Sequence, residues 1–214
     1  VTTTDRQIVF DLSNGQTSGS DGSSPMGRFQ LYYYNDKTAG NSGLNALLQS
    51  GSVSQQTKLY TVTDGLTLTN TGSWNHYAVT LQNTGNDLLY KTYENGTLVN
   101  TVQETGQSVN EITGALRATV GAALGSYYVT PVSTTGSVGW YKLSGSVDEF
   151  RYWKTARSAR QIGLNWLDQV EGGANTDDAS NKLGVYYKFN EGISTTTATD
   201  KKVLDYSGRV SNGT

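Results

Sequence analysis

The sequence predicts an all-β protein, a two-sheet antiparallel β-sandwich or jelly roll with one short helix. About ten short segments alternate apolar and polar residues, which is typical of half-buried strands because successive side chains point to opposite faces. Turn-forming residues separate these segments, and the chain of 214 residues contains 25 Gly, 14 Tyr and only 2 Pro. This length is ordinary for one large all-β domain and allows a core without metals or disulfides.

Alternation predicts a series of strands in the first half of the chain: residues 6–12, 27–34, 58–62, 66–68, 74–81, 88–93 and 98–102. In the second of these we expect Phe29, Leu31 and Tyr33 to point inward, which places Tyr32 on the opposite face. Residues 44–48 are apolar and compatible with either a strand or a helical turn. Asn95-Gly96 lies between two strands and is the strongest short signal for a hairpin.

Strands are also predicted for residues 116–121, 127–129, 140–143 and 183–189. Between the last two, residues 145–153 predict a central strand that carries Phe150 into the core. A helix near residues 156–170 follows, and Ser158 with Gln161 predicts a capping box at its start. We therefore treat residues 143–162 as the stretch around which the chain is organised.

Charge and composition exclude several functions. The net charge is −2, so no basic surface is expected to hold nucleic acid or an anionic membrane. No run of 18 apolar residues is present that would insert into a membrane. Cys is absent, which excludes disulfides and thiolate metal sites but is compatible with an extracellular location. His76 is the only histidine, and we expect it to be a partly buried strand residue and not a catalytic base.

Four stretches together resemble laminin-G-like jelly-roll domains of the concanavalin A-like lectin and glucanase superfamily. They are WNHYAVTL at residues 74–81, YENGTLV at 93–99, GSVDEFRYW at 145–153 and RSARQI at 157–162. Their order and spacing extend the resemblance over about residues 8–189. Such a fold hosts many functions, so the resemblance implies a fold more strongly than an activity.

The end of the chain departs from the family pattern. A segment like residues 183–192 commonly opens a domain of this family, whereas here it lies near the end of the sequence. Two explanations remain open: the sequence starts inside the domain, or residues 183–189 fold back and fill a vacant strand position. We expect one domain over residues 1–214, with residues 200–214 as a surface strap or the start of a linker.

The resemblance implies possible glycoside hydrolysis, but the residues argue against it. Glucanases of the superfamily carry two catalytic Glu around an Asp on one strand, and that pattern does not occur here. Asp148 and Glu149 are neighbours and would point to opposite faces of a strand, so they cannot form the pair alone. We expect no catalysis, and we expect Glu149 and Arg151, which share a face of the strand, to join a cross-strand ion pair.

The resemblance also implies a calcium ion at the rim of the sandwich. Calcium prefers hard oxygen ligands that include carboxylates. The candidate ligands are Asp11, Asp21, Asp148 and Asp205. Asp21 lies in a Gly- and Ser-rich loop that offers many carbonyl groups. The alternative is that these residues form solvated turns.

Exposed aromatic side chains are candidates for ligand binding, because sugars stack on them. The candidates are Tyr32, Tyr34, Tyr127, Tyr128, Trp140 and Tyr141. The sequence therefore predicts a recognition or adhesion module that binds a glycan or a protein, within a larger secreted, cell-surface or virion-surface protein. The alternatives are a structural component of a virus particle or tail and an atypical glycoside hydrolase.

Overall fold

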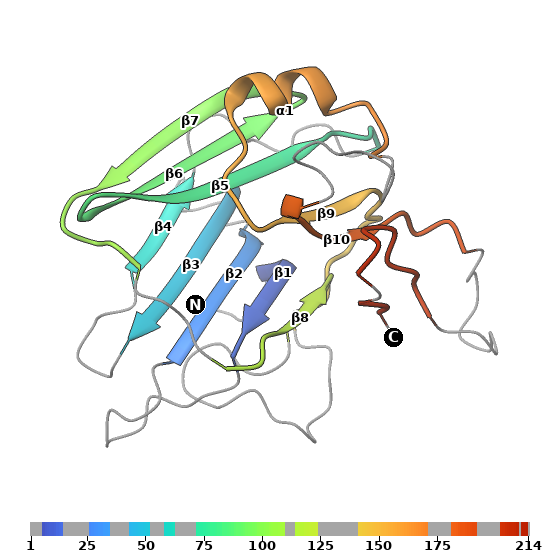
Figure 1. The fold of residues 1–214 in the computed structure, drawn as a ribbon, viewed down its shortest axis with the longest axis horizontal. Helices are drawn as coiled ribbons and strands as arrows, with labels where there is room; N and C mark the ends of the chain where they lie inside the picture. Colours follow the sequence, from blue (N-terminus) through green and yellow to red (C-terminus); the bar gives the residue numbers. More distant parts are fainter. Residues whose placement is uncertain are drawn as a thin grey trace. The chain divides into compact units, whose positions relative to one another are not determined.

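A computed structural model shows ten strands and one helix among the residues that it describes (Figure 1). It describes residues 6–14, 26–34, 43–51, 58–62, 72–109, 114–123, 141–170, 181–191, 202–209 and 211–213. The elements are β1 (Arg6–Ser13), β2 (Met26–Tyr34), β3 (Gly43–Gly51), β4 (Lys58–Val62), β5 (Tyr77–Thr84), β6 (Asp87–Glu94), β7 (Thr97–Glu104), β8 (Arg117–Val120), β9 (Phe150–Trp153), α1 (Ala159–Asn165) and β10 (Leu183–Tyr187).

The chain divides into two compact units. Unit 1 comprises residues 1–74, 83–92 and 99–144, and unit 2 comprises residues 75–82, 93–98 and 145–214. The single domain predicted from the sequence therefore stays a prediction. No helix among the described residues has the length and apolar character needed to cross a membrane.

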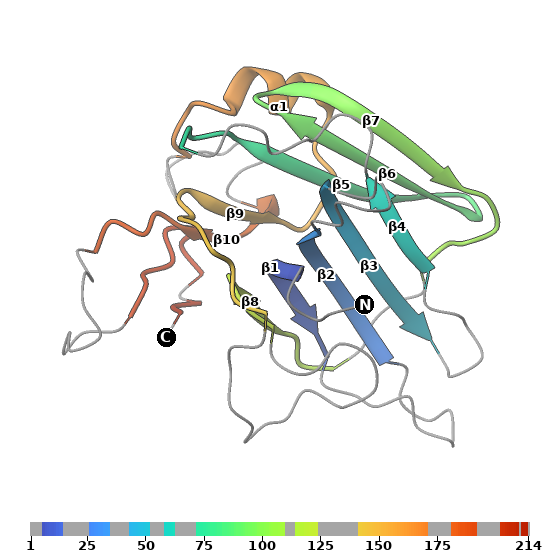
Figure 2. The same cartoon turned by 180° about the vertical axis from the view of Figure 1, so that it is seen from behind.

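A five-stranded antiparallel sheet in the order β4-β3-β2-β1-β8 dominates unit 1 (Figures 1 and 2). The segment at residues 44–48, ambiguous in the sequence, is part of strand β3. Residues 141–143 are not a strand, but they lie beside the sheet: the Ile8 amide donates to the Tyr141 carbonyl at 2.9 Å and the Leu143 amide to that of Gly121 at 2.8 Å. The predicted strands at residues 66–68 and 127–129 lie outside the described residues.

The most deeply buried face of this sheet carries polar residues. Arg28, Gln30 and Tyr32 alternate along β2 and are 5%, 0% and 1% exposed, whereas Phe29 on the other face is half-buried. The predicted inward face of β2 is therefore wrong. The Arg28 guanidinium forms two hydrogen bonds with the Asp11 carboxylate, at 2.9 and 2.7 Å, and this pairing allows both charges to be buried.

The hydrophobic core of unit 1 gathers around this same face. Ile8, Tyr32, Leu47 and Ala123 form one buried cluster, and Tyr141 packs against it. A β-bulge between Ile8 and Phe10 shifts the register of β1 against β2. Because a bulge adds one residue to a strand, it changes which side chains share a face. Ile8 and Asp11 consequently are both fully buried.

Strands β5, β6 and β7 form a three-stranded sheet that contributes residues to both units. The predicted hairpin between β6 and β7 is confirmed: Asn95 and Gly96 have φ of 48° and 78°, the left-handed conformation that a type I′ turn requires at both positions. In unit 2, the Asn95 side chain accepts a hydrogen bond from the His76 amide at 2.9 Å and donates one to Asn75 at 3.1 Å. The Asn95 side chain thus holds the turn to the residues that precede β5.

Unit 2 contains β9, α1 and β10. The Ser158 hydroxyl accepts from the Gln161 amide at 3.2 Å, and the Gln161 side chain accepts from the Ser158 amide at 2.9 Å, which confirms the capping box. The helix is only seven residues long, so the prediction of a helix over residues 156–170 was too generous. Its Ile162 is 7% exposed.

The predicted central strand at residues 145–153 is wrong in extent and position. Only Phe150–Trp153 form a strand, β9, and it belongs to a two-stranded sheet with β10. Phe150 is half-buried and its ring stacks on that of Tyr187 at 6.2 Å, so it is not a deep core residue. The expected fold-back of residues 183–189 is confirmed only as pairing within the chain: β10 pairs with β9 in a two-stranded sheet and is not an inner strand.

Candidate functional site

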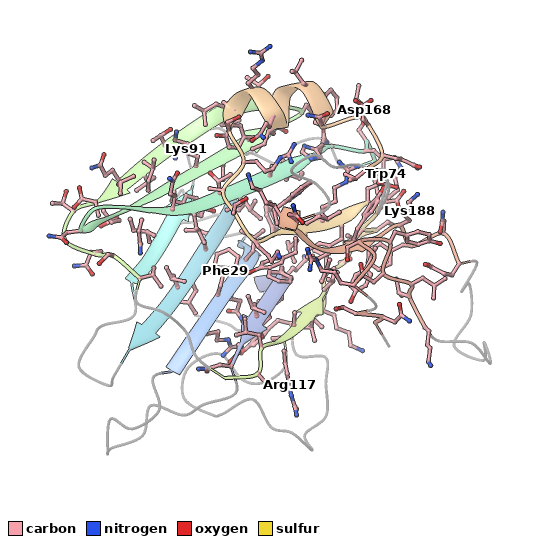
Figure 3. All side chains as sticks on the ribbon, in the orientation of Figure 1. Phe29, Trp74, Lys91, Arg117, Asp168 and Lys188 are labelled. Atoms are coloured by element: carbon pink, nitrogen blue, oxygen red, sulfur yellow. The ribbon has the colours of Figure 1, made fainter. Side chains whose placement is uncertain are left out.

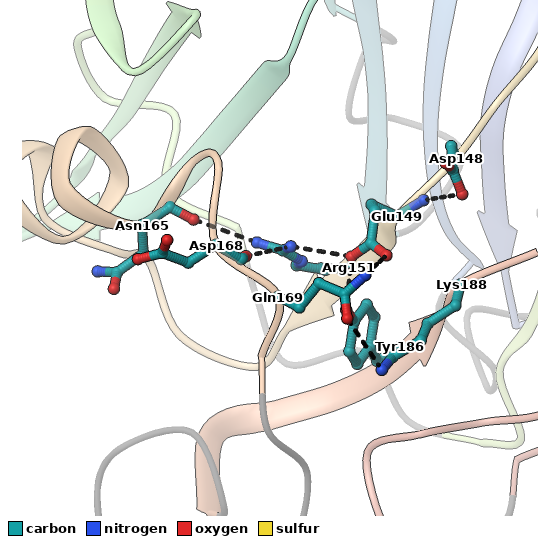
Figure 4. A network of polar contacts seen from close by, with 8 residues as sticks. All are labelled: Asp148, Glu149, Arg151, Asn165, Asp168, Gln169, Tyr186 and Lys188. Carbon is teal, nitrogen blue, oxygen red and sulfur yellow. Dashed lines mark hydrogen bonds and ion pairs between the residues drawn. The ribbon is translucent and has the colours of Figure 1, made fainter.

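Arg151 is the centre of a polar network in unit 2 (Figure 4). Its guanidinium donates to the Glu149 carboxylate at 3.0 Å and to the backbone carbonyls of Asn165 at 3.3 Å and Asp168 at 2.5 Å. The carbonyls belong to the end of α1 and the chain that follows it. Arg151 therefore joins β9 to the helix, and its side chain is only 12% exposed.

Glu149 immediately precedes β9 and has a φ of 54°. This left-handed conformation is uncommon for a residue with a side chain. The Glu149 carboxylate accepts hydrogen bonds from Arg151, from the Tyr186 hydroxyl at 2.5 Å and from the side-chain amide of Gln169 at 3.3 Å. Both of its oxygens are thus engaged, and the ion pair with Arg151 joins two residues of the same segment, whereas the sequence predicted a cross-strand pair.

Tyr186 reaches this network from β10, where it is the register partner of Arg151. Its ring is fully buried, and the Arg151 guanidinium carbon lies 5.3 Å from the ring centroid. Burial, and next the hydrogen bond to Glu149, raise the pKa of Tyr186 to about 12. The phenol is therefore a proton donor at physiological pH and not an activated nucleophile.

Lys188, labelled in Figure 3, and Tyr206 form the outer part of the cluster, and both are half-buried. The Lys188 ammonium lies 4.8 Å from the Tyr206 ring centroid, 5.4 Å from that of Tyr186 and 3.4 Å from the Gln169 side-chain oxygen. The Tyr206 hydroxyl lies 3.4 Å from the oxygen of the exposed Asn190 amide. We call Glu149, Arg151, Gln169, Tyr186, Lys188 and Tyr206 the polar–aromatic cluster.

Asp205 organises the turn that presents Tyr206. Its carboxylate accepts from the amides of Tyr186 and Ser211, both at 3.0 Å, and from the Ser207 amide and hydroxyl, both at 2.9 Å. Burial alone would raise the pKa of Asp205, but these hydrogen bonds outweigh it and lower the pKa. The predicted surface strap is therefore, over the described residues, a turn hydrogen-bonded to β10.

The described candidate calcium ligands, Asp11, Asp148 and Asp205, do not belong to any group of three or more acidic side chains in the part of the chain that the structure describes. Both Asp11 oxygens accept from Arg28, and the Asp205 oxygens accept the four hydrogen bonds given above, so calcium would have to displace these partners. Asp148 is exposed and accepts from the Glu149 amide at 2.9 Å, and Asp21 lies outside the described residues. No group of three or more acidic, His or Cys side chains gathers within the described part of the chain. Calcium binding stays a prediction.

Of the six predicted ligand-binding aromatics, the two that the structure describes belong to or pack against one buried core. Tyr32 is 1% exposed, which corrects the expectation that it faces away from the core, and Tyr141 packs against the same core. The side chains of Tyr34, Tyr127, Tyr128 and Trp140 lie outside what the structure describes. Ligand binding by these four stays a prediction.

His76 belongs to unit 2 and is half-buried. Its ring is 6.1 Å from that of Trp166, and its buried Nδ1 has no hydrogen-bond partner among the described residues. Burial, and next the charge of Arg151, lower the pKa of His76. The expectation of a partly buried histidine is confirmed, although it precedes strand β5.

The sequence did not single out Tyr186, Lys188 or Tyr206. One signal was present: alternation along residues 183–189 puts Tyr186 and Lys188 on the same face, opposite the apolar residues. Tyr206 follows Asp205 in a polar segment, and no periodicity marks it. Only the fold brings these three residues to Arg151.

Comparisons with known proteins identify the family but no individual relative. A laminin-G family model described as the concanavalin A-like lectin/glucanases superfamily matches residues 1–163. No curated protein and no solved structure matches the chain. The match ends within α1, and four of the six cluster residues lie beyond it: Gln169, Tyr186, Lys188 and Tyr206.

Proposed function

The chain belongs to the concanavalin A-like lectin/glucanases superfamily, and we propose that it is a non-catalytic recognition or adhesion module that binds a glycan or a protein. The match agrees with the antiparallel sheets and single short helix, and it confirms the all-β sandwich class predicted from the sequence. We propose further that the module belongs to a larger secreted, cell-surface or virion-surface protein.

The ion pair and hydrogen bonds of Glu149 are the observation that supports the non-catalytic part of this proposal. Glycoside hydrolysis requires a carboxylic acid and a second carboxylate that flank the scissile bond. Glu149 is ion-paired with Arg151 and accepts hydrogen bonds from Tyr186 and Gln169, so it has the surroundings of a structural carboxylate. The raised pKa of Tyr186 likewise argues against a tyrosine nucleophile.

Two assays test the proposal on the full chain. Incubation with β-glucans, agar-type galactans and sialosides should release no reducing ends above a blank. A glycan array, together with a panel of surface proteins, should give saturable binding to at least one ligand. Turnover that disappears in Glu149→Gln would overturn the non-catalytic assignment, and absence of binding in both formats would overturn the recognition role.

A further inference from the structure

Lys188 lies at the outer side of the polar–aromatic cluster, and no carboxylate among the described residues neutralises its positive charge. The charge of Arg151 is balanced by Glu149 at 3.0 Å. Among the described residues no carboxylate forms an ion pair with Lys188, whose ammonium contacts two tyrosine rings and one amide oxygen. An ammonium has three donors, and at 3.4 Å the bond to Gln169 is a weak one. The side chain is therefore ready to donate to an anion.

The neighbours of Lys188 suit a sugar ring. Tyr206 is half-exposed, and a half-exposed aromatic ring offers apolar surface on which the C–H groups of a pyranose can stack. The oxygen of the exposed Asn190 side chain lies 3.4 Å from the Tyr206 hydroxyl, and the two N–H groups of the same amide can donate to sugar hydroxyls. Charge, ring and amide thus lie together on the segment that runs from β10 to the C-terminal turn.

This surface is held in place before any ligand arrives. The Tyr206 amide donates to the Tyr186 carbonyl at 2.8 Å, and the two rings meet edge to face with centroids 6.2 Å apart. The hydrogen bonds of Asp205 fix the turn that bears Tyr206. Preorganisation of this kind lowers the entropic cost of binding.

We propose that Lys188, Tyr206 and Asn190 form a binding site for an acidic sugar, with the sugar carboxylate or sulfate on the Lys188 ammonium. This inference rests on the proposed function and names its ligand class. An acidic peptide fits less well, because peptides commonly bind by adding a strand to a sheet edge. That edge of β10 already carries a bridge between Tyr187 and Asp205.

The test measures binding of the full chain to matched acidic and neutral sugars by calorimetry. The pairs are 3′-sialyllactose against lactose and trigalacturonate against its methyl ester, with sulfated lactose to distinguish sulfate from carboxylate. We expect each acidic sugar of the preferred type to bind about tenfold more tightly than its neutral partner, since a hydrogen bond to a charged group is among the stronger ones. The difference should shrink at high salt, because exposed charges are screened.

Variants assign the effect to the site. Lys188→Gln should lose about tenfold in affinity for the acidic sugar and leave the neutral sugar unchanged, for the same reason. Lys142→Gln is the matched control: it removes the same charge from an exposed lysine of unit 1 and should bind like the unchanged chain. Tyr206→Phe keeps the ring and should retain most of the binding, whereas Tyr206→Ala should weaken it, with folding checked by thermal melting.

The outcomes separate this inference from the proposed function. Equal binding of acidic and neutral sugars, or acidic-sugar binding that Lys188→Gln and Lys142→Gln alter equally, overturns the inference and leaves the recognition role standing. Lys188-dependent binding of a polyglutamate peptide without binding of any sugar overturns it too. Failure of the unchanged chain to bind any glycan or surface protein overturns the proposed function itself.

Discussion

At the scale of single residues, burial controls how the titratable groups of unit 2 behave. Tyr186 illustrates this, because its fully buried hydroxyl keeps its proton to a pKa of about 12, compared with an ordinary value of 10.0. The folded state binds this proton more tightly than the unfolded state. The resulting stabilisation is complete below the unfolded pKa and is lost as the pH rises toward the folded one.

Tyr186→Phe should therefore flatten part of the alkaline loss of stability. The variant should cost about 1 kcal/mol at neutral pH, since one hydrogen bond to Glu149 is removed. Urea unfolding at pH 8 and at higher pH, followed by tryptophan fluorescence, measures both effects. If the unchanged chain and the variant lose stability equally on going to alkaline pH, Tyr186 does not retain its proton as described.

His76 gives the opposite dependence on pH. Its lowered pKa means that it stays neutral in the folded state at a pH where the unfolded chain begins to protonate it. The folded state should thus be fully stable above the ordinary histidine pKa of 6.5 and lose stability as the pH falls below that value. His76→Gln should show a smaller drop in unfolding free energy between pH 7.5 and pH 5.5, measured with urea. A drop as large as that of the unchanged chain would assign the effect to other groups.

At the scale of elements, the turn after β6 depends on its contact with α1. A Cβ on Gly96 would lie 2.3 Å from Cδ1 of Trp166, and one on Gly163 would lie 3.2 Å from the Gly96 carbonyl oxygen. The two glycines let helix and turn approach closely. Gly96 also has a φ of 78°, which disfavours any other residue except Asn or Asp.

Gly96→Ala should destabilise the protein by more than the strain of its backbone alone. Gly85→Ala is a matched control, since Gly85 has a φ of 66° but nothing within 4 Å of its added Cβ. We expect the control to lose about 1 kcal/mol and Gly96→Ala to lose about 3 kcal/mol or more. Thermal and urea unfolding measure the difference. Equal losses would show that Trp166 does not rest on the turn.

Local sequence signals were sufficient to predict individual turns and caps, whereas the buried face of β2 depends on a residue far away in the sequence. The conformation of the Asn95-Gly96 turn and the Ser158–Gln161 capping box follow from the residue types at adjacent positions, so the sequence was sufficient to predict both, although contacts with distant residues then add to the turn. The buried face of β2 was predicted wrongly because polar residues normally point to solvent. Asp11, 17 residues away in sequence, pairs with Arg28, and this pairing allows the polar face to be buried. No periodicity within β2 contains this information.

At the scale of the whole molecule, the C-terminal segment completes unit 2. Leu183 and Tyr186 of β10 are 1% and 0% exposed, and Lys154 of the chain after β9 donates its amide to the Lys182 carbonyl at 2.8 Å. A lone β9 would have no partner here, because its sheet has only two strands. The polar–aromatic cluster depends on the same C-terminal segment, which explains why the sequence motifs alone did not predict the cluster.

A chain that ends at Ala179 should therefore lose the cooperative unfolding of the full chain and bind ANS through exposed apolar surface. A chain that ends at Asn190 keeps β10 and removes the Asp205 turn, so it separates the two contributions. We expect it to be more stable than the shorter chain and less stable than the full one. Unchanged, cooperative melting of the chain ending at Ala179 would assign the segment to another domain.

The hydrogen bonds of β1 have a consequence for the timing of folding. The Gln7 side chain accepts from the Ser144 amide across a sequence separation of 137 residues, and Ile8 donates to Tyr141. The ribosome releases a chain from its N-terminal end at about 5–20 residues per second. The outer edge of β1, which pairs with β8 in the finished sheet, consequently waits several seconds for its partner and stays open to other chains during that interval, whereas β2 pairs with β3 soon after it emerges.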